Sequence, residues 1–89
     1  MLHLARAIVT AAAFLEFAED DVLSPDDAVR ALENMASDLC GAAPEEIEAL
    51  RLAARKERDA QKAAGANAEV LKFYDQFVYN FGLEDQPSA

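Results

Sequence analysis

The sequence predicts an all-α fold, a compact antiparallel bundle of four helices. Apolar residues recur at helical spacing in four segments, and three of these segments begin at a capping residue or a proline. No stretch alternates apolar with polar residues in the way a half-buried strand does. The connections, of about two to seven residues, favour antiparallel neighbours. We therefore expect helices over residues 2–17, 25–40, 44–64 and 68–81.

The first predicted helix is apolar around well over half of its circumference, so we expect it to be buried on several sides. The run from Ala7 to Leu15 also resembles the apolar part of a secretory signal. However, a membrane span needs about 20 apolar residues, and Glu16 follows this shorter run directly. We therefore expect a retained core helix, no membrane contact and a cytoplasmic protein.

The second predicted helix has the clearest start signal in the chain. Ser24 can cap it, and Pro25 suits the first helical position because no amide donor is needed there. Asp26 and Asp27 then lie at the positive end of the helix dipole. Gly41 is placed to end the helix in the left-handed conformation. The apolar face of this helix carries Ala28, Val29, Leu32, Met35, Ala36 and Leu39.

The third predicted helix begins at Pro44 with acidic residues in its first turn, but Ala43 offers no capping side chain. Its core face ends at Ala54, so its second half has little to bury. Alanines and charged residues of good helix propensity can keep that half helical until Gly65 ends it.

The fourth predicted helix begins at Asn67, which can cap it, and is ended by Gly82. It is the most aromatic of the four. Its apolar face carries Val70, Phe73, Tyr74, Phe77, Val78 and Phe81. We expect residues 1–83 to form a single helical domain and residues 84–89 to form a short flexible tail.

Composition and charge exclude several classes of protein. The chain has 89 residues, 53% of them hydrophobic, which suits one folded domain rather than a disordered acidic tail. Its 17 acidic and 8 basic side chains give a net charge of -9, which disfavours nucleic acid as a partner. A single cysteine cannot form an internal disulfide, which excludes a disulfide-stapled secreted scaffold.

The residues that carry common catalytic or metal chemistry are too few for a recognisable site. His3 is the only imidazole and Cys40 the only thiol, so no His/Cys zinc cluster can form. The acidic stretch between Glu19 and Asp27 lacks the central glycine of a calcium loop. Ser24 is explained as a helix cap. We therefore predict no enzyme, no metal site and no cofactor.

Two families of small acidic helical proteins offer a comparison without a motif match. Acyl carrier proteins attach their cofactor to a serine in an Asp-Ser-Leu motif, whereas Ser24 lies between Leu23 and Pro25. The E-type colicin immunity proteins resemble this chain in size, charge and helical class. Their toxin-binding surface uses an adjacent tyrosine pair, whereas Tyr74 and Tyr79 are separated here. No residue role is carried over from either family.

The acidic residues provide the main functional hypothesis. Residues 16–27 contain six acids and no base, whereas residues 51–62 contain five bases and two acids. An acidic region of this kind can steer and hold a basic protein. We expect a non-enzymatic protein–protein interaction module, with an immunity-like or antitoxin-like inhibitor as its most concrete form. The candidate partner-binding residues are Glu19, Asp20, Asp21, Asp26 and Asp27.

The alternative hypothesis is a structural subunit that only associates with itself. Phe17, Leu52 and Tyr79 break the amphipathic pattern of their helices, because each lies away from the predicted core face. Together with the wide apolar face of the first helix, they suggest a contact with a second copy. A symmetric homodimer is the commonest arrangement of this kind.

Overall fold

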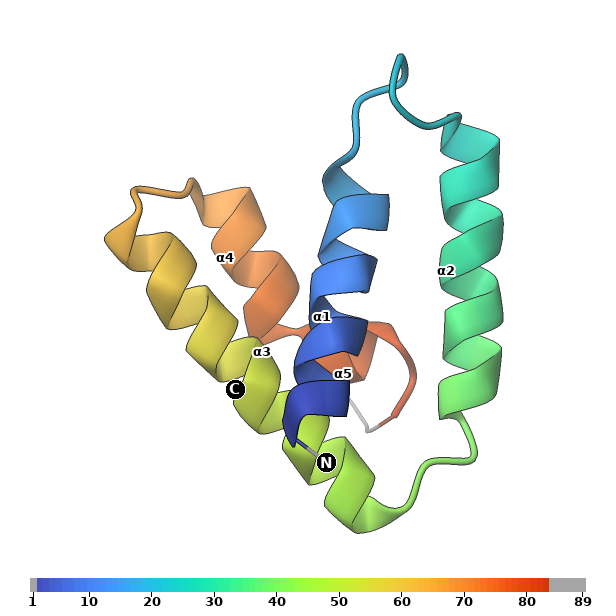
Figure 1. Cartoon of the computed structure of the whole chain (residues 1–89), viewed down its shortest axis with the longest axis vertical. Coiled ribbons are helices and arrows are strands. Elements are labelled where there is room, and N and C mark those ends of the chain that lie inside the picture. Colours follow the sequence, from blue (N-terminus) through green and yellow to red (C-terminus); the bar gives the residue numbers. More distant parts are fainter. Residues whose placement is uncertain (1, 84–89) are drawn as a thin grey trace.

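The computed structural model describes residues 2–83, and every regular element in that range is a helix. Consecutive long helices run in opposite directions, and the four long helices form one compact body, so the predicted all-α fold is confirmed (Figure 1). The predicted tail at 84–89 lies outside the described residues. The elements are α1 (Leu2–Phe17), α2 (Pro25–Leu39), α3 (Pro44–Ala63), α4 (Ala68–Asp75) and α5 (Phe77–Asn80).

The core lies where α1, α3 and the α4–α5 segment meet. On α1 and α3 it consists largely of alanines, whose small side chains let these helices approach closely. On α4 and α5 it is mainly aromatic. Phe77 and Val9, each 1% exposed, are the largest fully buried side chains in the described chain. The buried residues are Ala5, Val9, Ala12, Ala49, Leu50, Ala53, Ala54, Phe73, Tyr74, Phe77 and Val78.

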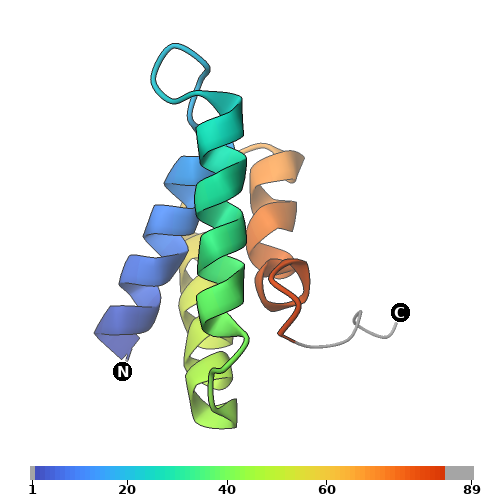
Figure 2. The same ribbon diagram turned by 90° about the vertical axis from the view of Figure 1, so that its right-hand side faces the viewer.

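Helix α2 is amphipathic, yet none of its residues is buried. The helix pairs in extensive contact are α1–α2, α1–α3, α3–α4 and α3–α5, so α2 has one main neighbour. In Figure 2, α2 lies in front of the rest of the molecule, with α1 on its left and α4 on its right. Its apolar residues Leu32, Met35 and Leu39 reach the core only in part.

Helix α1 is less enclosed than its apolar sequence predicts. Only Ala5, Val9 and Ala12 are buried, and they face the core. Away from this core face, Leu4 is 71% and Phe14 is 55% exposed. No other helix is drawn in front of α1 in Figure 1. Within residues 2–83, no helix combines the length and the apolar character that crossing a bilayer requires.

Two of the predicted helix starts have the expected caps. The Ser24 hydroxyl accepts a hydrogen bond from the backbone N–H of Asp27 at 3.5 Å. The Asn67 side chain accepts one from Val70 at 3.0 Å. At the start of α3 the sequence predicts no side-chain cap, since Ala43 has no polar group. The structure nevertheless provides a partner for the backbone N–H of Ala43, which donates a hydrogen bond to the Glu46 carboxylate at 2.8 Å.

The glycine stop signals are correct at two helix ends and wrong at one. Gly65, at φ +87°, and Gly82, at φ +72°, both adopt the left-handed conformation. Gly41 does not: α2 ends at Leu39, Cys40 follows as its C-cap with φ -63°, and the chain continues without a left-handed residue. The reason is local: the N–H of Ala42 bonds to the carbonyl of Leu39 in a simple turn.

The predicted helix over 68–81 is divided in two. Gln76, at φ -106° and ψ 16°, leaves the helical conformation between α4 and α5. The aromatic face continues across this break, with Phe73 and Tyr74 buried before it and Phe77 and Val78 buried after it. The period of the apolar residues is therefore preserved although the helix is not.

Candidate protein-interaction surface

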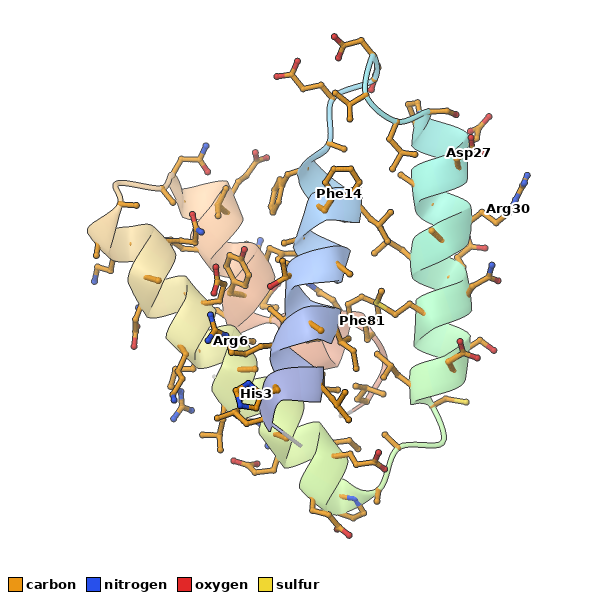
Figure 3. All side chains as sticks on the ribbon, viewed as in Figure 1. His3, Arg6, Phe14, Asp27, Arg30 and Phe81 are labelled. Atoms are coloured by element: carbon orange, nitrogen blue, oxygen red, sulfur yellow. The ribbon has the colours of Figure 1, made fainter. Side chains whose placement is uncertain are left out.

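The five predicted acidic residues lie together at one end of the α1–α2 hairpin, and all are exposed. We call this surface the acidic corner. Its loop is ordered by two backbone hydrogen bonds, because the N–H groups of Val22 and Leu23 both donate to the carbonyl of Glu19, at 2.9 and 3.0 Å. Figure 3 shows carboxylates pointing outward from this loop. The residues are Glu19, Asp20, Asp21, Asp26 and Asp27.

Only some carboxylates of the acidic corner contribute to the stability of a helix. Asp26 and Asp27 lie in the first turn of α2, where they stabilise the positive end of the helix dipole. Glu19, Asp20 and Asp21 precede the helix and have no such function. Among the described residues, none of the five forms an ion pair.

Three acidic residues elsewhere form ion pairs within the described chain. Glu48 accepts a hydrogen bond from Arg51, and the Arg58 guanidinium lies within 4 Å of both Asp59 and Asp75. Part of the predicted basic stretch on α3 is therefore neutralised within the chain. Other exposed acids, such as Glu33 and Asp38, also form no ion pair among the described residues, so the acidic corner is distinguished by having five unpaired carboxylates close together.

A groove of about 430 Å³ lies next to the acidic corner, and the sequence did not reveal it. Its walls come from the end of α1, from the middle of α2 and from the α4–α5 segment. Apolar and aromatic side chains form its floor, and carboxylates stand on its rim. Phe81, the C-cap residue of α5, is one of the aromatic lining residues and is labelled in Figure 3. The main lining residues are Glu16, Val29, Leu32, Glu33, Phe73 and Phe81.

The three predicted self-association residues lie on different elements. Phe17 ends α1 and is 40% exposed, Leu52 on α3 is 43% exposed, and Tyr79 on α5 is partly exposed. Phe17 also has an intramolecular contact, since its ring packs against Phe73 at a centroid distance of 5.4 Å and an angle of 76°. This aromatic contact explains why an apolar residue lies on the polar side of α1.

The groups with chemical reactivity are dispersed. Over residues 2–83, no three histidine, cysteine, aspartate or glutamate side chains come close enough to hold a metal ion. His3 and Cys40 are both exposed. Burial raises the pKa of the Tyr74 phenol above its ordinary value of 10.0, and the nearby Glu57 carboxylate raises it further.

Comparison of the chain with protein-family models, with curated proteins and with solved structures finds no match in any of the three. Its function is therefore inferred from its surface chemistry alone.

Proposed function

We propose that this protein is a non-enzymatic protein–protein interaction module that binds a basic partner protein through the acidic corner. One observation carries the proposal: five exposed carboxylates lie on an ordered loop and helix start, and none is paired within the described chain. Carboxylates held close together repel one another, and a basic surface relieves this repulsion when it binds.

Concentrated surface charge mainly affects the rate at which two proteins associate. A concentrated negative surface accelerates association with a positive one, and salt weakens the effect by screening. An immunity-like or antitoxin-like inhibitor is the most concrete version of this function. In that version the acidic corner covers a basic surface that a toxin or nuclease needs for its own activity.

Affinity capture with the full chain tests the proposal. The test variant is Glu19→Gln/Asp20→Asn/Asp21→Asn, which leaves the two acids at the start of α2 in place. The control variant, Asp38→Asn/Glu45→Gln/Glu69→Gln, removes the same charge from exposed sites outside the acidic corner. We expect the wild type and the control to retain a basic protein at low salt and the test variant to lose most of it.

Three results would contradict this function. One is that no basic protein is retained by the wild type. A second is that both variants lose the partner equally, because only the overall charge would then matter. A retained protein that resists elution by salt would likewise exclude a contact dominated by the acidic corner.

Self-association is the second candidate, and the outer side of α1 favours it. This side has a shallow hollow of about 660 Å³ lined in part by Ala7, Thr10 and Phe14. Exposed apolar area on a helix often marks a contact with another chain. Sedimentation equilibrium at several concentrations separates the two candidates. A monomer at all concentrations excludes self-association, whereas a dimer that needs no other protein supports it.

A further inference from the structure

Helix α2 combines a clear apolar face with incomplete burial. Val29, Leu32 and Ala36 follow one another at spacings of three and four residues, so they share one side of the helix. All three line the groove, and Val29 remains 54% exposed. An amphipathic helix normally buries its apolar face. Here Leu32 packs partly against the core whereas Val29 stays exposed, so the described chain covers this part of α2 only incompletely.

The opposite wall of the groove is aromatic and firmly held. Phe73 packs edge to face against Tyr74 and Phe77, at centroid distances of 5.3 and 5.7 Å. Phe81 packs against Phe77 at 4.8 Å. A guest in the groove would therefore meet a preformed surface, which lowers the entropy lost on binding.

The shape of the groove suits a helix. Along α2 its lining runs from Val29 to Ala36, which is about two helical turns or 10 Å. A volume of about 430 Å³ can receive several side chains but not a folded domain. A helix laid in such a groove contacts it with residues at i, i+3, i+4 and i+7.

The charges at the rim indicate which charge a bound segment should carry. Glu16 and Glu33 line the groove, and no basic side chain of the described residues does. Arg30, the basic residue of α2, points away from the body of the molecule (Figure 3). A lysine or arginine beside the apolar face of a guest helix would meet these two carboxylates.

We propose that the groove receives an amphipathic helix of the partner, with its apolar side on Val29, Phe73 and Phe81 and its basic residues beside Glu16 and Glu33. The inference rests on the proposed function and names the element of the partner that is bound. The acidic corner attracts the basic protein, and the groove holds its helix.

A synthetic peptide provides the probe. It is a helix-forming 14-residue peptide of leucine and lysine, with leucine at i, i+3, i+4 and i+7 and one tryptophan on the apolar side. The protein contains no tryptophan, so the indole fluorescence reports the peptide alone. Two control peptides have the same composition in scrambled order, or glutamate in place of lysine. We expect micromolar binding of the amphipathic basic peptide, at least tenfold weaker binding of the scrambled peptide and none of the acidic one.

Matched protein variants locate the peptide. Val29→Arg places a bulky cation in the groove, whereas Leu52→Arg makes the same charge change on α3. Both sites are exposed, and circular dichroism checks that both variants remain helical. We expect Val29→Arg to weaken binding at least tenfold and Leu52→Arg to weaken it less than threefold. Glu33→Gln, which keeps the size of the side chain, should weaken it a few-fold.

The outcomes separate the groove from the acidic corner. Equal binding to Val29→Arg and Leu52→Arg, equal binding of the scrambled peptide, or no binding would each overturn the inference. If Asp20→Asn/Asp21→Asn leaves peptide affinity and association rate unchanged while Val29→Arg removes binding, the groove is supported and the proposed role of the acidic corner fails.

Discussion

Arg58 on α3 and Asp75 at the end of α4 form an ion pair in which the guanidinium Nε lies 2.8 Å from the carboxylate Oδ1. The atoms are close, but their orientation does not satisfy the geometry of a hydrogen bond, and this Nε is buried. The pair joins two helices where α3 contributes no buried apolar side chain. It therefore provides a polar connection beyond the end of the α3 core face.

The first prediction concerns this ion pair. Asp75→Asn removes the charge that faces the buried Nε while keeping the size of the side chain. Because Asp75 is about half exposed, we expect a loss of about 0.5–1 kcal/mol in the free energy of unfolding, smaller at high salt. Urea denaturation measures it. Asp59→Asn is the matched control, since Asp59 lies 3.5 Å from the same guanidinium and is more exposed. Equal losses in the two variants would contradict the prediction.

The second prediction compares two glycines. Gly65 completes the end of α3 through hydrogen bonds from its own N–H to Lys62 and from Ala66 to Gln61, at 3.1 and 2.9 Å. Its φ of +87° is unfavourable for any residue with a Cβ. We expect Gly65→Ala to lower stability by about 1–2 kcal/mol.

The control for Gly65 is Gly41, whose φ is not positive. A Cβ would meet no atom within 4 Å at either glycine, so crowding cannot explain a difference between them. We expect Gly41→Ala to raise stability by about 0.4–1 kcal/mol, because alanine restricts the unfolded chain. Thermal and urea unfolding measure both variants. A loss of equal size at both positions would show that the backbone conformation is not the cause.

The third prediction tests the aromatic half of the core. Phe77 is 1% exposed and contacts the rings of Phe73 and Phe81. Phe77→Ala should cost about 3–5 kcal/mol through lost burial and the cavity that remains, most of the stability of a small domain. Leu52→Ala, at a site 43% exposed, should cost much less. A Phe77→Ala protein that unfolds at the same urea concentration as the wild type would contradict this core assignment.

The sequence predicts the positions of the helices well because their signals are local. Ser24, Asn67 and Gly65 each act within a few residues, through a cap or a left-handed turn. Gly41 misleads because a glycine permits a left-handed residue without requiring one. Glu46 acts as a cap from inside its helix, and its place three residues after Ala43 is the local signal for this cap.

The candidate site was predictable in its charge but not in its shape. The acidic corner follows from five acids concentrated within nine residues, 19–27. The groove depends on how far α2 stands from α4 and α5, and no local pattern encodes that distance. The apolar face of α2 predicts burial, yet which neighbour covers Val29 is decided by packing between distant segments. The break at Gln76 is a further feature that the regular spacing of aromatic residues conceals.

The last prediction concerns stability at alkaline pH. Burial, and then the Glu57 carboxylate, raises the pKa of the Tyr74 phenol above 10.0 in the folded protein. The folded state thus holds the phenolic proton more tightly than the unfolded chain. This contribution to stability is fully present below pH 10, and it is lost as the pH rises through the folded pKa. Wild type should therefore lose stability above pH 10 more steeply than Tyr74→Phe, which has no proton to release.

Urea unfolding between pH 8 and pH 12 measures this difference. All other ionisable groups are common to both proteins, so the difference between the two curves isolates Tyr74. Absorbance at 295 nm, again as wild type minus Tyr74→Phe, gives the phenol titration directly. Glu57→Gln should shift this titration toward lower pH, because it removes the neighbouring negative charge. Parallel stability curves for wild type and Tyr74→Phe would show that the phenol titrates alike in the folded and unfolded chains.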